Sequence, residues 1–203
     1  FVHEFNATDP DGDALAYSIT GGPDQTLFDL NASTGVLSFK IMPDFENPLD
    51  ANSDNVYELT IQVSDGTAQP TTNLQIQVTD QNEAPVFTSI PDPQVGENQT
   101  FVTELNATDP DGNALLFSIT GGPDQALFDL NDTSGALTFI NAPDFESPED
   151  NNSDNVYFLS VQVTDGELSA TQNIQVSVTD IVETPPNSAP VFTSISDPFV
   201  PEN

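Results

Sequence analysis

Apolar residues occupy every second position in the longest hydrophobic runs of the chain. The segments "VYELTIQVS" from Val56 and "NLQIQV" from Asn73 alternate Tyr, Leu, Ile and Val with polar residues. Because successive side chains of a β-strand point to opposite faces, this period predicts half-buried strands. Turn segments such as "TGGPDQ" and "SDGTAQP" separate the runs, and no stretch has a helical period of useful length. The pattern therefore predicts an all-β fold of sandwiches with about 100 residues each.

The alternation occurs twice because the chain is a tandem repeat. Residues 1–80 align on residues 101–180 without a gap, and 51 of these 80 positions are identical. A second self-match relates "APVFTSIPDPQVGEN" from Ala84 to "APVFTSISDPFVPEN" from Ala189. The expected organisation is a repeat 1 without its first strand at 1–83, a repeat 2 at 84–184, a linker at 185–188 and the first strand of a third repeat at 189–203.

The charge of the chain is strongly one-sided. It has 33 acidic residues and a single cationic side chain apart from one histidine, Lys40, which gives a formal net charge of −32 over 203 residues. Such a chain repels nucleic-acid phosphates, so a nucleic-acid partner is excluded. No apolar run approaches membrane-spanning length, and we expect no membrane insertion of this segment. The carboxylates serve either solubility or the binding of cations.

The sequence gives little support for an enzyme. It has no cysteine, one histidine and no insertion that would build a cleft. Two close carboxylates can hydrolyse glycosides, but here the carboxylates have a better use as cation ligands. The lack of cysteine also removes disulfides and thiolate metal sites.

Many of the acidic residues gather at the predicted turns. Calcium accepts carboxylate, amide and backbone oxygens at flexible geometry, whereas zinc prefers His or Cys, which are nearly absent. Loops collect at the two ends of a sandwich, so carboxylates far apart in sequence can converge there. The turn clusters therefore predict Ca²⁺ sites. In repeat 2 they are "VGEN" from Val95, "DPDGN" from Asp109, "PDFE" from Pro143, "DNNSDN" from Asp150 and "VTDG" from Val163.

The order of these motifs resembles that of cadherin repeats. The segment "ATDPDGNALLFSI" is similar to the family's Asp-x-Asp motif, "VGEN" to its x-Glu-x motif and "PDFE" to its Asp-x-Glu motif. "YFLSVQVTDG" resembles the strand that ends in a further ligand Asp, and "VTDQNEAPVF" resembles the linker between domains. The resemblance covers essentially the whole chain. It implies tandem seven-stranded Greek-key β-sandwiches of cadherin or Ig type, joined end to end with Ca²⁺ at the junctions.

The resemblance also implies a ligand set for each junction. Between repeats 1 and 2 the set is Asp44, Glu46, Asp80, Asn82, Glu83, Asp109, Asp111 and Asp165, with backbone oxygens at Gln81 and Asn113. The equivalent residues for the junction before repeat 1 are Asp9, Asp11 and Asp65. The junction after repeat 2 has Glu97, Asp144, Glu146, Asp180 and Glu183, and Glu202 is expected to act in a receiving copy as Glu97 does in repeat 2.

Both linkers depart from the form usual in the family. The first, "DQNEAP", is one residue shorter and has Glu83 where Asp-Asn is expected. The second, "DIVETPPNSAP", has no Asn two residues after Asp180, and only Glu183 and Asn187 are available to substitute. We therefore expect the second junction to bind fewer ions and to bend more.

One loop in each repeat is extra to the family pattern. The segments "DANSDN" from Asp50 and "DNNSDN" from Asp150 have oxygens at alternate positions, like the start of a calcium loop. They lack the glycine and the distant Glu of an EF-hand. A polar loop stabilised by Asx turns is the alternative, and the sequence leaves both interpretations open.

Together these features favour a calcium-rigidified structural or adhesive module of a long secreted or surface protein of bacterial type. Its expected partners are neighbouring cadherin-like repeats, head-to-tail copies of itself, surface glycans or other cell-surface proteins. The alternative, a carbohydrate-binding module, is disfavoured because the chain has no Trp and its three Tyr residues have inward registers.

A further expectation concerns residues 189–203, which copy the strand that repeat 1 lacks. We expect this tail to fill the edge of repeat 1 in the next copy, either in a continuous array or between separate subunits.

Overall fold

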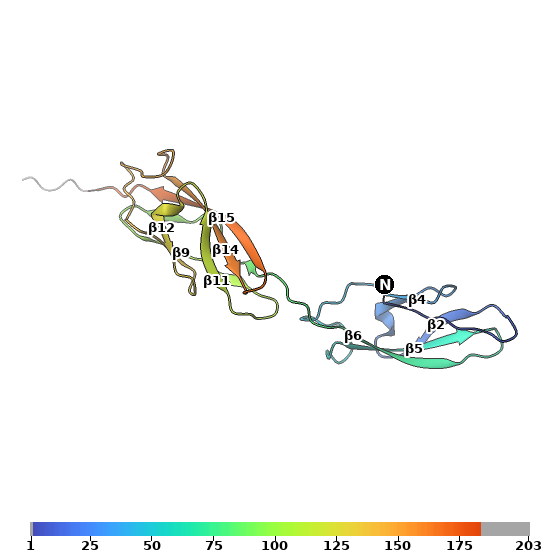
Figure 1. The fold of residues 1–203 in the computed structure, drawn as a ribbon. Coiled ribbons are helices and arrows are strands. Elements are labelled where there is room, and N and C mark those ends of the chain that lie inside the picture. Colours follow the sequence, from blue (N-terminus) through green and yellow to red (C-terminus); the bar gives the residue numbers. More distant parts are fainter. Residues whose placement is uncertain (1, 184–203) are drawn as a thin grey trace, which may run out of the picture. The chain divides into compact units, whose positions relative to one another are not determined.

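The computed structural model describes residues 2–183, which form β-strands and two single-turn 3₁₀ helices without any α-helix (Figure 1). By their contacts these residues divide into two compact units. Unit 1 comprises residues 2–86, 107–115 and 163–170, and unit 2 comprises residues 87–106, 116–162 and 171–183. The prediction of an all-β chain is confirmed.

Repeat 1 forms two three-stranded antiparallel sheets. Their strand orders are β1-β4-β3 and β2-β5-β6. The strands are β1 (His3–Glu4), β2 (Ala16–Gly21), β3 (Phe28–Leu30), β4 (Val36–Phe39), β5 (Val56–Ser64) and β6 (Thr71–Gln77), and the 3₁₀ turn η1 is Gln25–Leu27.

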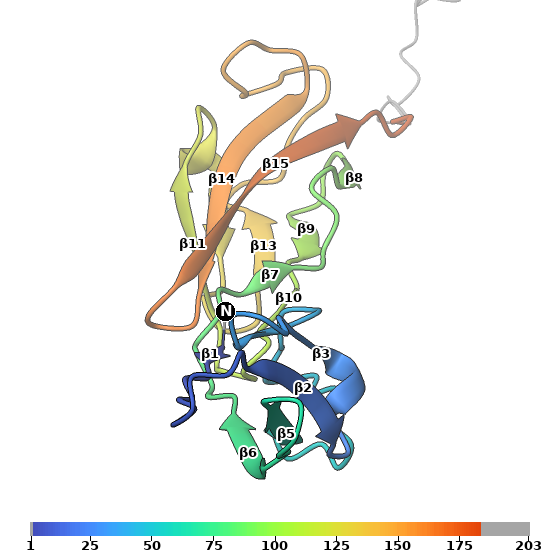
Figure 2. The same ribbon diagram turned by 90° about the vertical axis from the view of Figure 1, so that its right-hand side faces the viewer.

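Repeat 2 repeats these six strands and adds three more. Its sheets have the orders β11-β14-β15-β8, β12-β13-β9 and β10-β7, and β8 lies parallel to β15. Figure 2 shows β11, β14 and β15 side by side in the first of these sheets. The strands are β7 (Val86–Phe87), β8 (Gln94–Gly96), β9 (Phe101–Glu104), β10 (Ala107–Thr108), β11 (Leu116–Gly121), β12 (Phe128–Leu130), β13 (Ala136–Phe139), β14 (Val156–Thr164) and β15 (Ser169–Thr179), and the turn η2 is Gln125–Leu127. The added strands are β7, β8 and β10.

An aromatic cluster lies at the centre of each core. In repeat 1 the ring centroid of Phe39 is 4.3 Å from that of Phe28 and 5.0 Å from that of Tyr57. Tyr57, Leu59 and Ile61 alternate along β5 with more exposed residues and are themselves at most 3% exposed. The equivalent rings of repeat 2 have the same arrangement. The predicted alternation of this strand is confirmed.

A buried carboxylate holds the "TGGPDQ" turn against β5. Gly22 has a φ of +101°, and a Cβ at this position would collide with the backbone of Glu58. Asp24 is only 2% exposed, and its two oxygens accept hydrogen bonds from the N–H groups of Glu58 (2.7 Å) and Ala51 (2.8 Å). Asp124 makes the equivalent bonds in repeat 2. The turn was predicted from the sequence, but the burial of its aspartate was not.

The repeats differ at one sheet edge. In repeat 2 the strand β8 covers the outer edge of β15, whereas within residues 2–183 no segment pairs with the outer edge of β6. Ile174 and Val176 on β15 are at most 1% exposed, but their counterparts Leu74 and Ile76 are only partly buried. At the start of β6 is an apolar cavity of about 170 Å³. It is lined by Phe5, Asn6, Ala7, Tyr17, Ile61, Val63, Pro70, Thr71 and Thr72.

Candidate metal centre

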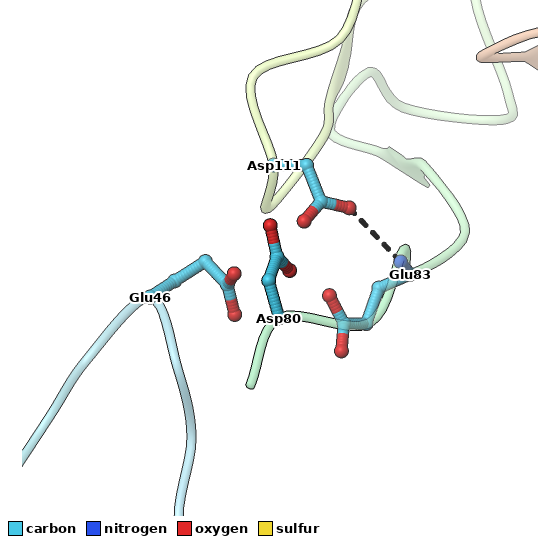
Figure 3. Close-up of side chains that lie close together, drawn as sticks. All are labelled: Glu46, Asp80, Glu83 and Asp111. Atoms are coloured by element: carbon cyan, nitrogen blue, oxygen red, sulfur yellow. Dashed lines mark hydrogen bonds between the residues drawn. The ribbon is translucent and has the colours of Figure 1, made fainter. Parts of the chain in front are cut away.

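Four carboxylates from three separate segments converge within unit 1. Oxygens of Glu46, Asp80, Glu83 and Asp111 all lie within 4.8 Å of one another, and Figure 3 shows the side chains pointing toward a common centre. Glu46 comes from the loop after β4, and Asp80 and Glu83 come from the segment after β6. Asp111 lies in the loop between β10 and β11, and its Oδ2 accepts a hydrogen bond from the Glu83 N–H at 2.9 Å. We call these four residues the linker cluster.

The linker cluster has more acceptors than donors. Although both side chains are exposed, loss of hydration among the crowded groups, followed by repulsion from the neighbouring carboxylates, raises the pKa values of Glu46 and Glu83 above the usual range. Two solvent-shielded oxygens, Asp109 Oδ2 and Asp111 Oδ1, have no hydrogen-bond partner among residues 2–183. Shielded carboxylate oxygens without donors are costly unless a cation neutralises them. This donor set, all oxygen and mostly carboxylate, fits Ca²⁺.

Amide side chains tie the linker to the loops beside the cluster. Asn82 donates from Nδ2 to Asp165 Oδ2 at 2.8 Å, and its Oδ1 accepts from Asn113 Nδ2 at 2.9 Å. The Asn82 amide, with the N–H groups of Glu167 and Leu168, holds the pKa of Asp165 below its usual range. Three expected ligands, Asn82, Asn113 and Asp165, are thus arranged next to the four carboxylates.

The remaining expected ligands of this junction flank the cluster without joining its four oxygens. Asp44 uses Oδ1 to accept the N–H groups of Glu46 and Asn47, both at 3.1 Å. Asp109 likewise uses Oδ1 for the Asn113 N–H at 3.1 Å, which leaves its other oxygen free. Asp44 and Gln81 line a cavity of about 360 Å³ together with Glu46 and Glu83.

A second carboxylate cluster lies in unit 2 and contains Glu97, Asp144 and Glu146. Glu97 is 1% exposed, and its oxygens accept the N–H groups of Ile181 (2.7 Å) and Phe145 (2.9 Å). These two bonds lower the pKa of Glu97.

Glu146 differs from Glu97 in the balance of its interactions. Its own backbone N–H lowers its pKa, but loss of hydration and the carboxylates of Glu97, Asp180 and Asp144 outweigh that bond and raise it. Asp180 therefore lies near the second cluster. Glu183 is not one of the three clustered carboxylates; its Oε1 accepts from Nδ2 of Asn98, the residue after Glu97, at 3.1 Å.

The expected ligands at the other end of repeat 1 form no comparable group among the described residues. Asp9 Oδ1 accepts the N–H groups of Asp11 and Asp13, at 2.8 and 3.1 Å, in an Asx-type turn. Asp65 accepts the N–H groups of Thr67 and Ala68, which lower its pKa. Asp9, Asp11 and Asp65 stay predicted ligands. Glu202, Asn187, the 185–188 linker and the 189–203 strand lie outside the described residues.

The loops "DANSDN" and "DNNSDN" have the Asx-type arrangement. Asp50 is 5% exposed, and its two oxygens accept the N–H groups of Asp54 (2.9 Å) and Asn55 (3.3 Å). Asp150 makes the same pair of bonds. Backbone donors thus occupy both oxygens of each carboxylate. Of the two interpretations left open by the sequence, the geometry favours the loop stabilised by its own hydrogen bonds.

Comparison with known proteins identifies the class of these sandwiches. Residues 1–79 match the Cadherin domain family, and residues 82–177 match a Bacterial Ig domain family. The chain is 29% identical to human Cadherin-23 over 197 residues, which are 91% of this chain and 6% of that protein. It is 31% identical to mouse Protocadherin-15 over 206 residues, 93% of this chain and 9% of that protein. The chain therefore spans a small part of these relatives.

Solved structures agree on the fold. The crystal structure of human Protocadherin-24 EC1-2, form II, superposes with a TM-score of 0.56 at 22% identity and covers 88% of each chain. The chain thus consists of tandem cadherin-like repeats, as its motifs predicted. The prediction of tandem β-sandwiches is also confirmed.

The matched families indicate the general kind of function. Cadherin domains are in general adhesion modules and not enzymes, in line with the expectation from composition. The matched families give no support to the carbohydrate-binding alternative. Among residues 2–183 there is no helix with the length and apolar character needed to cross a membrane.

Proposed function

We propose that this chain is a calcium-binding and calcium-rigidified structural or adhesive module of an extracellular protein. The observation that carries the proposal is the linker cluster, together with two oxygens that no described donor reaches, one on its member Asp111 and one on Asp109. In sequence, Glu46 and Asp80 belong to repeat 1 and Asp111 belongs to repeat 2. A cation held by these carboxylates would therefore couple the two repeats.

The residues of the linker cluster explain why the two repeats would be coupled with a bound cation and uncoupled without one. Without a cation, the carboxylates of Glu46, Asp80, Glu83 and Asp111 repel one another, and the segments that bear them tend to separate. A bound Ca²⁺ would supply positive charge and coordination sites for these oxygens. Asn82 would keep the linker close to the loops by its bonds to Asp165 and Asn113.

The proposed location is the cell surface or the extracellular space. Extracellular modules typically bind Ca²⁺ with Kd values of roughly 10⁻⁴–10⁻³ M, which matches calcium outside cells and not in cytoplasm. The proposed partners are neighbouring cadherin-like repeats and other cell-surface proteins.

The test is a Ca²⁺ titration of the 203-residue chain by isothermal calorimetry after removal of divalent ions. We expect binding in this range, and a higher melting temperature and a narrower scattering-derived length distribution with Ca²⁺ than with EDTA. Asp111→Asn should weaken the binding, whereas the control variant Asp13→Asn, at an exposed position where repeat 2 already has Asn113, should not. A parent chain that behaves identically in Ca²⁺ and EDTA would refute the proposal.

We further propose head-to-tail strand donation, in which residues 189–203 of one copy fill, in another copy, the edge of β6 that no segment of residues 2–183 pairs with. What supports it is the contrast with repeat 2, where the similar segment 84–98 covers the equivalent surface. There Phe87 contacts Phe117, the counterpart of the cavity residue Tyr17, and β8 pairs with β15. Such a contact is heterologous and would propagate as a filament.

Sedimentation velocity over a range of chain concentrations tests the donation. Val200 corresponds to Val95, which is 7% exposed in the core of repeat 2, so Val200→Asp should abolish the association. Val182 is 90% exposed, and Val182→Asp is the matched control that should associate like the parent. A parent that stays monomeric at all concentrations, or a Val200→Asp variant that still assembles, would rule out strand donation.

A further inference from the structure

Asn55 contacts two chain segments that each lead to a residue of the linker cluster. Its side-chain Nδ2 donates to the backbone oxygen of Phe45 at 2.9 Å, and Phe45 directly precedes Glu46. Its own backbone oxygen accepts from the Val78 N–H at 2.9 Å, two residues before Asp80. A single residue therefore joins the segment of Glu46 to the segment of Asp80.

The loop before β5 holds Asn55 in an uncommon backbone conformation. Asn55 has a φ of +62°, in the left-handed region that Asn tolerates better than most other residues. The buried Asp50 carboxylate accepts the Asn55 N–H, and Asp24 anchors the loop through the N–H groups of Ala51 and Glu58. The position of the Asn55 amide is thus set by this loop and not by the four carboxylates of the linker cluster.

Repeat 2 contains the same arrangement. Asn155 has a φ of +63°, donates from Nδ2 to the Phe145 oxygen at 3.0 Å and accepts from the Val178 N–H at 2.9 Å. Phe145 lies between Asp144 and Glu146, and Val178 lies two residues before Asp180. Since both loops join a segment of the Asp-x-Glu motif to the strand end before the next Asp, the contact is a regular feature of these repeats.

We propose that Asn55 is a positioning residue for the cation site, because it holds the peptide before Glu46 and the chain end before Asp80 at a fixed separation. The inference rests on the proposed function. Mutually repelling carboxylates tend to move apart, and a ligand set held together by neighbouring hydrogen bonds binds a cation with less reorganisation. This assigns a role to the "DANSDN" loop without making its carboxylates ligands.

The second cluster provides an internal contrast. In unit 2 the carboxylate of Glu97 adds a further connection between the same two segments, through the N–H groups of Phe145 and Ile181. No described residue of unit 1 makes an equivalent bond. Within the described residues, Asn55 is therefore the residue that joins the segments of Glu46 and Asp80.

Asn55→Gly is the sharpest test variant. Glycine keeps the left-handed backbone and the carbonyl that accepts Val78, but removes the amide that donates to Phe45. We expect a 10- to 100-fold weaker Ca²⁺ affinity of the linker cluster, typical for loss of a group that supports metal ligands. The fall of the melting temperature in EDTA should be small and no larger than that of Asn155→Gly, which loses the equivalent hydrogen bond. The matched variant Asn155→Gly should leave this binding step at its parent value.

Two measurements on the full chain test the positioning role: calorimetric Ca²⁺ titration and thermal melting in EDTA. Both are also made on the double variant Asn55→Gly/Asp111→Asn. Combining the changes should weaken binding by less than the product of the two single effects, because both act on one site. If the parent binds Ca²⁺ and Asn55→Gly binds equally well, the positioning role is wrong while the proposed function stands. It is also wrong if the loss of affinity is matched by a large fall of the EDTA melting temperature. A parent that binds no Ca²⁺ overturns both.

Discussion

Repeats 1 and 2 have closely related sequences but shield their shared strands to different extents. Tyr57 and Tyr157 are both 1% exposed, so the centre of the core is the same in each. Ile174 on β15 is 1% exposed, whereas its counterpart Leu74 on β6 is only partly buried. The alternating pattern thus determines which side chain faces inward, and the segment of β7 and β8 determines how completely it is covered.

The same contrast applies to the acidic clusters. In unit 2 the segment of Glu97 brings a buried carboxylate to the Asp-x-Glu peptide, and in unit 1 the Asn55 amide makes the only comparable contact among the described residues. One covering segment therefore affects both core burial and the support of candidate ligands.

The largest expected losses of stability come from substitutions in the core, which the two repeats share. Leu59→Ala and Leu159→Ala each remove a side chain that is 2% exposed and should each lower the free energy of unfolding by about 3 kcal/mol. Urea unfolding in EDTA, followed by circular dichroism, measures both. Costs that differ by more than about 1.5 kcal/mol would show that the two cores are not equivalent.

The next pair of substitutions compares the covered strand β15 with its counterpart β6. Ile174→Ala should cost about 3 kcal/mol, but Leu74→Ala only about 1 kcal/mol, because partial burial leaves less transfer free energy to lose. The same unfolding assay applies. Equal costs would mean that β6 is covered in solution by a segment outside the described residues.

A smaller effect is expected at the buried aspartates. Asp24→Asn and Asp124→Asn replace one acceptor oxygen by an NH₂ group that faces a backbone N–H, which should cost about 1–3 kcal/mol in each repeat. Amide exchange of Glu58 and Phe158, whose N–H groups bond to these carboxylates, provides a local readout. Unchanged protection of both amides would contradict the assigned bonds.

The smallest expected effect concerns the one lysine. Lys40 Nζ lies 3.9 Å from Asp29 and both side chains are exposed, while repeat 2 has Ile140 at the equivalent position. Lys40→Gln should change the free energy of unfolding by less than about 0.5 kcal/mol. A larger, salt-dependent loss in thermal melts would show that this ion pair contributes more than exposed pairs usually do.

Much of the fold was predictable because it depends on local alternation. The period of two puts Tyr57 and Leu59 on the same face of one strand, and both side chains are buried on that face. The buried Asp24 was not predictable, since a Pro-Asp pair in a glycine-rich segment is typical of exposed turns. The recurrence of "TGGPDQ" in both repeats was the available signal.

The candidate site was predictable as a set of residues but not as a geometry. Glu46, Asp80, Glu83 and Asp111 were all implied by motifs, and the structure brings them together. The motifs implied Asp44 and Asp109 as ligands equally, yet one carboxylate oxygen of each already accepts a hydrogen bond from a nearby backbone N–H. The role of Asn55 depends on a positive φ and on two contacts distant in sequence, so only the repeated "SDNVY" pointed to it.

The single lysine also allows local opening of one segment of the chain to be measured by proteolysis. Trypsin cleaves after Lys and Arg, so Lys40–Ile41 is the only bond in the 203 residues that it can attack. This bond lies just after β4, in the segment that leads to Glu46, and Lys40 Nζ donates to the Thr26 oxygen at 2.8 Å. Cleavage by a protease requires local opening of its substrate, and its rate follows the population of the open form when reclosing is fast. The rate of tryptic cleavage therefore measures how often this segment of repeat 1 opens, without any label, and repeat 2 contributes no background because it has no site.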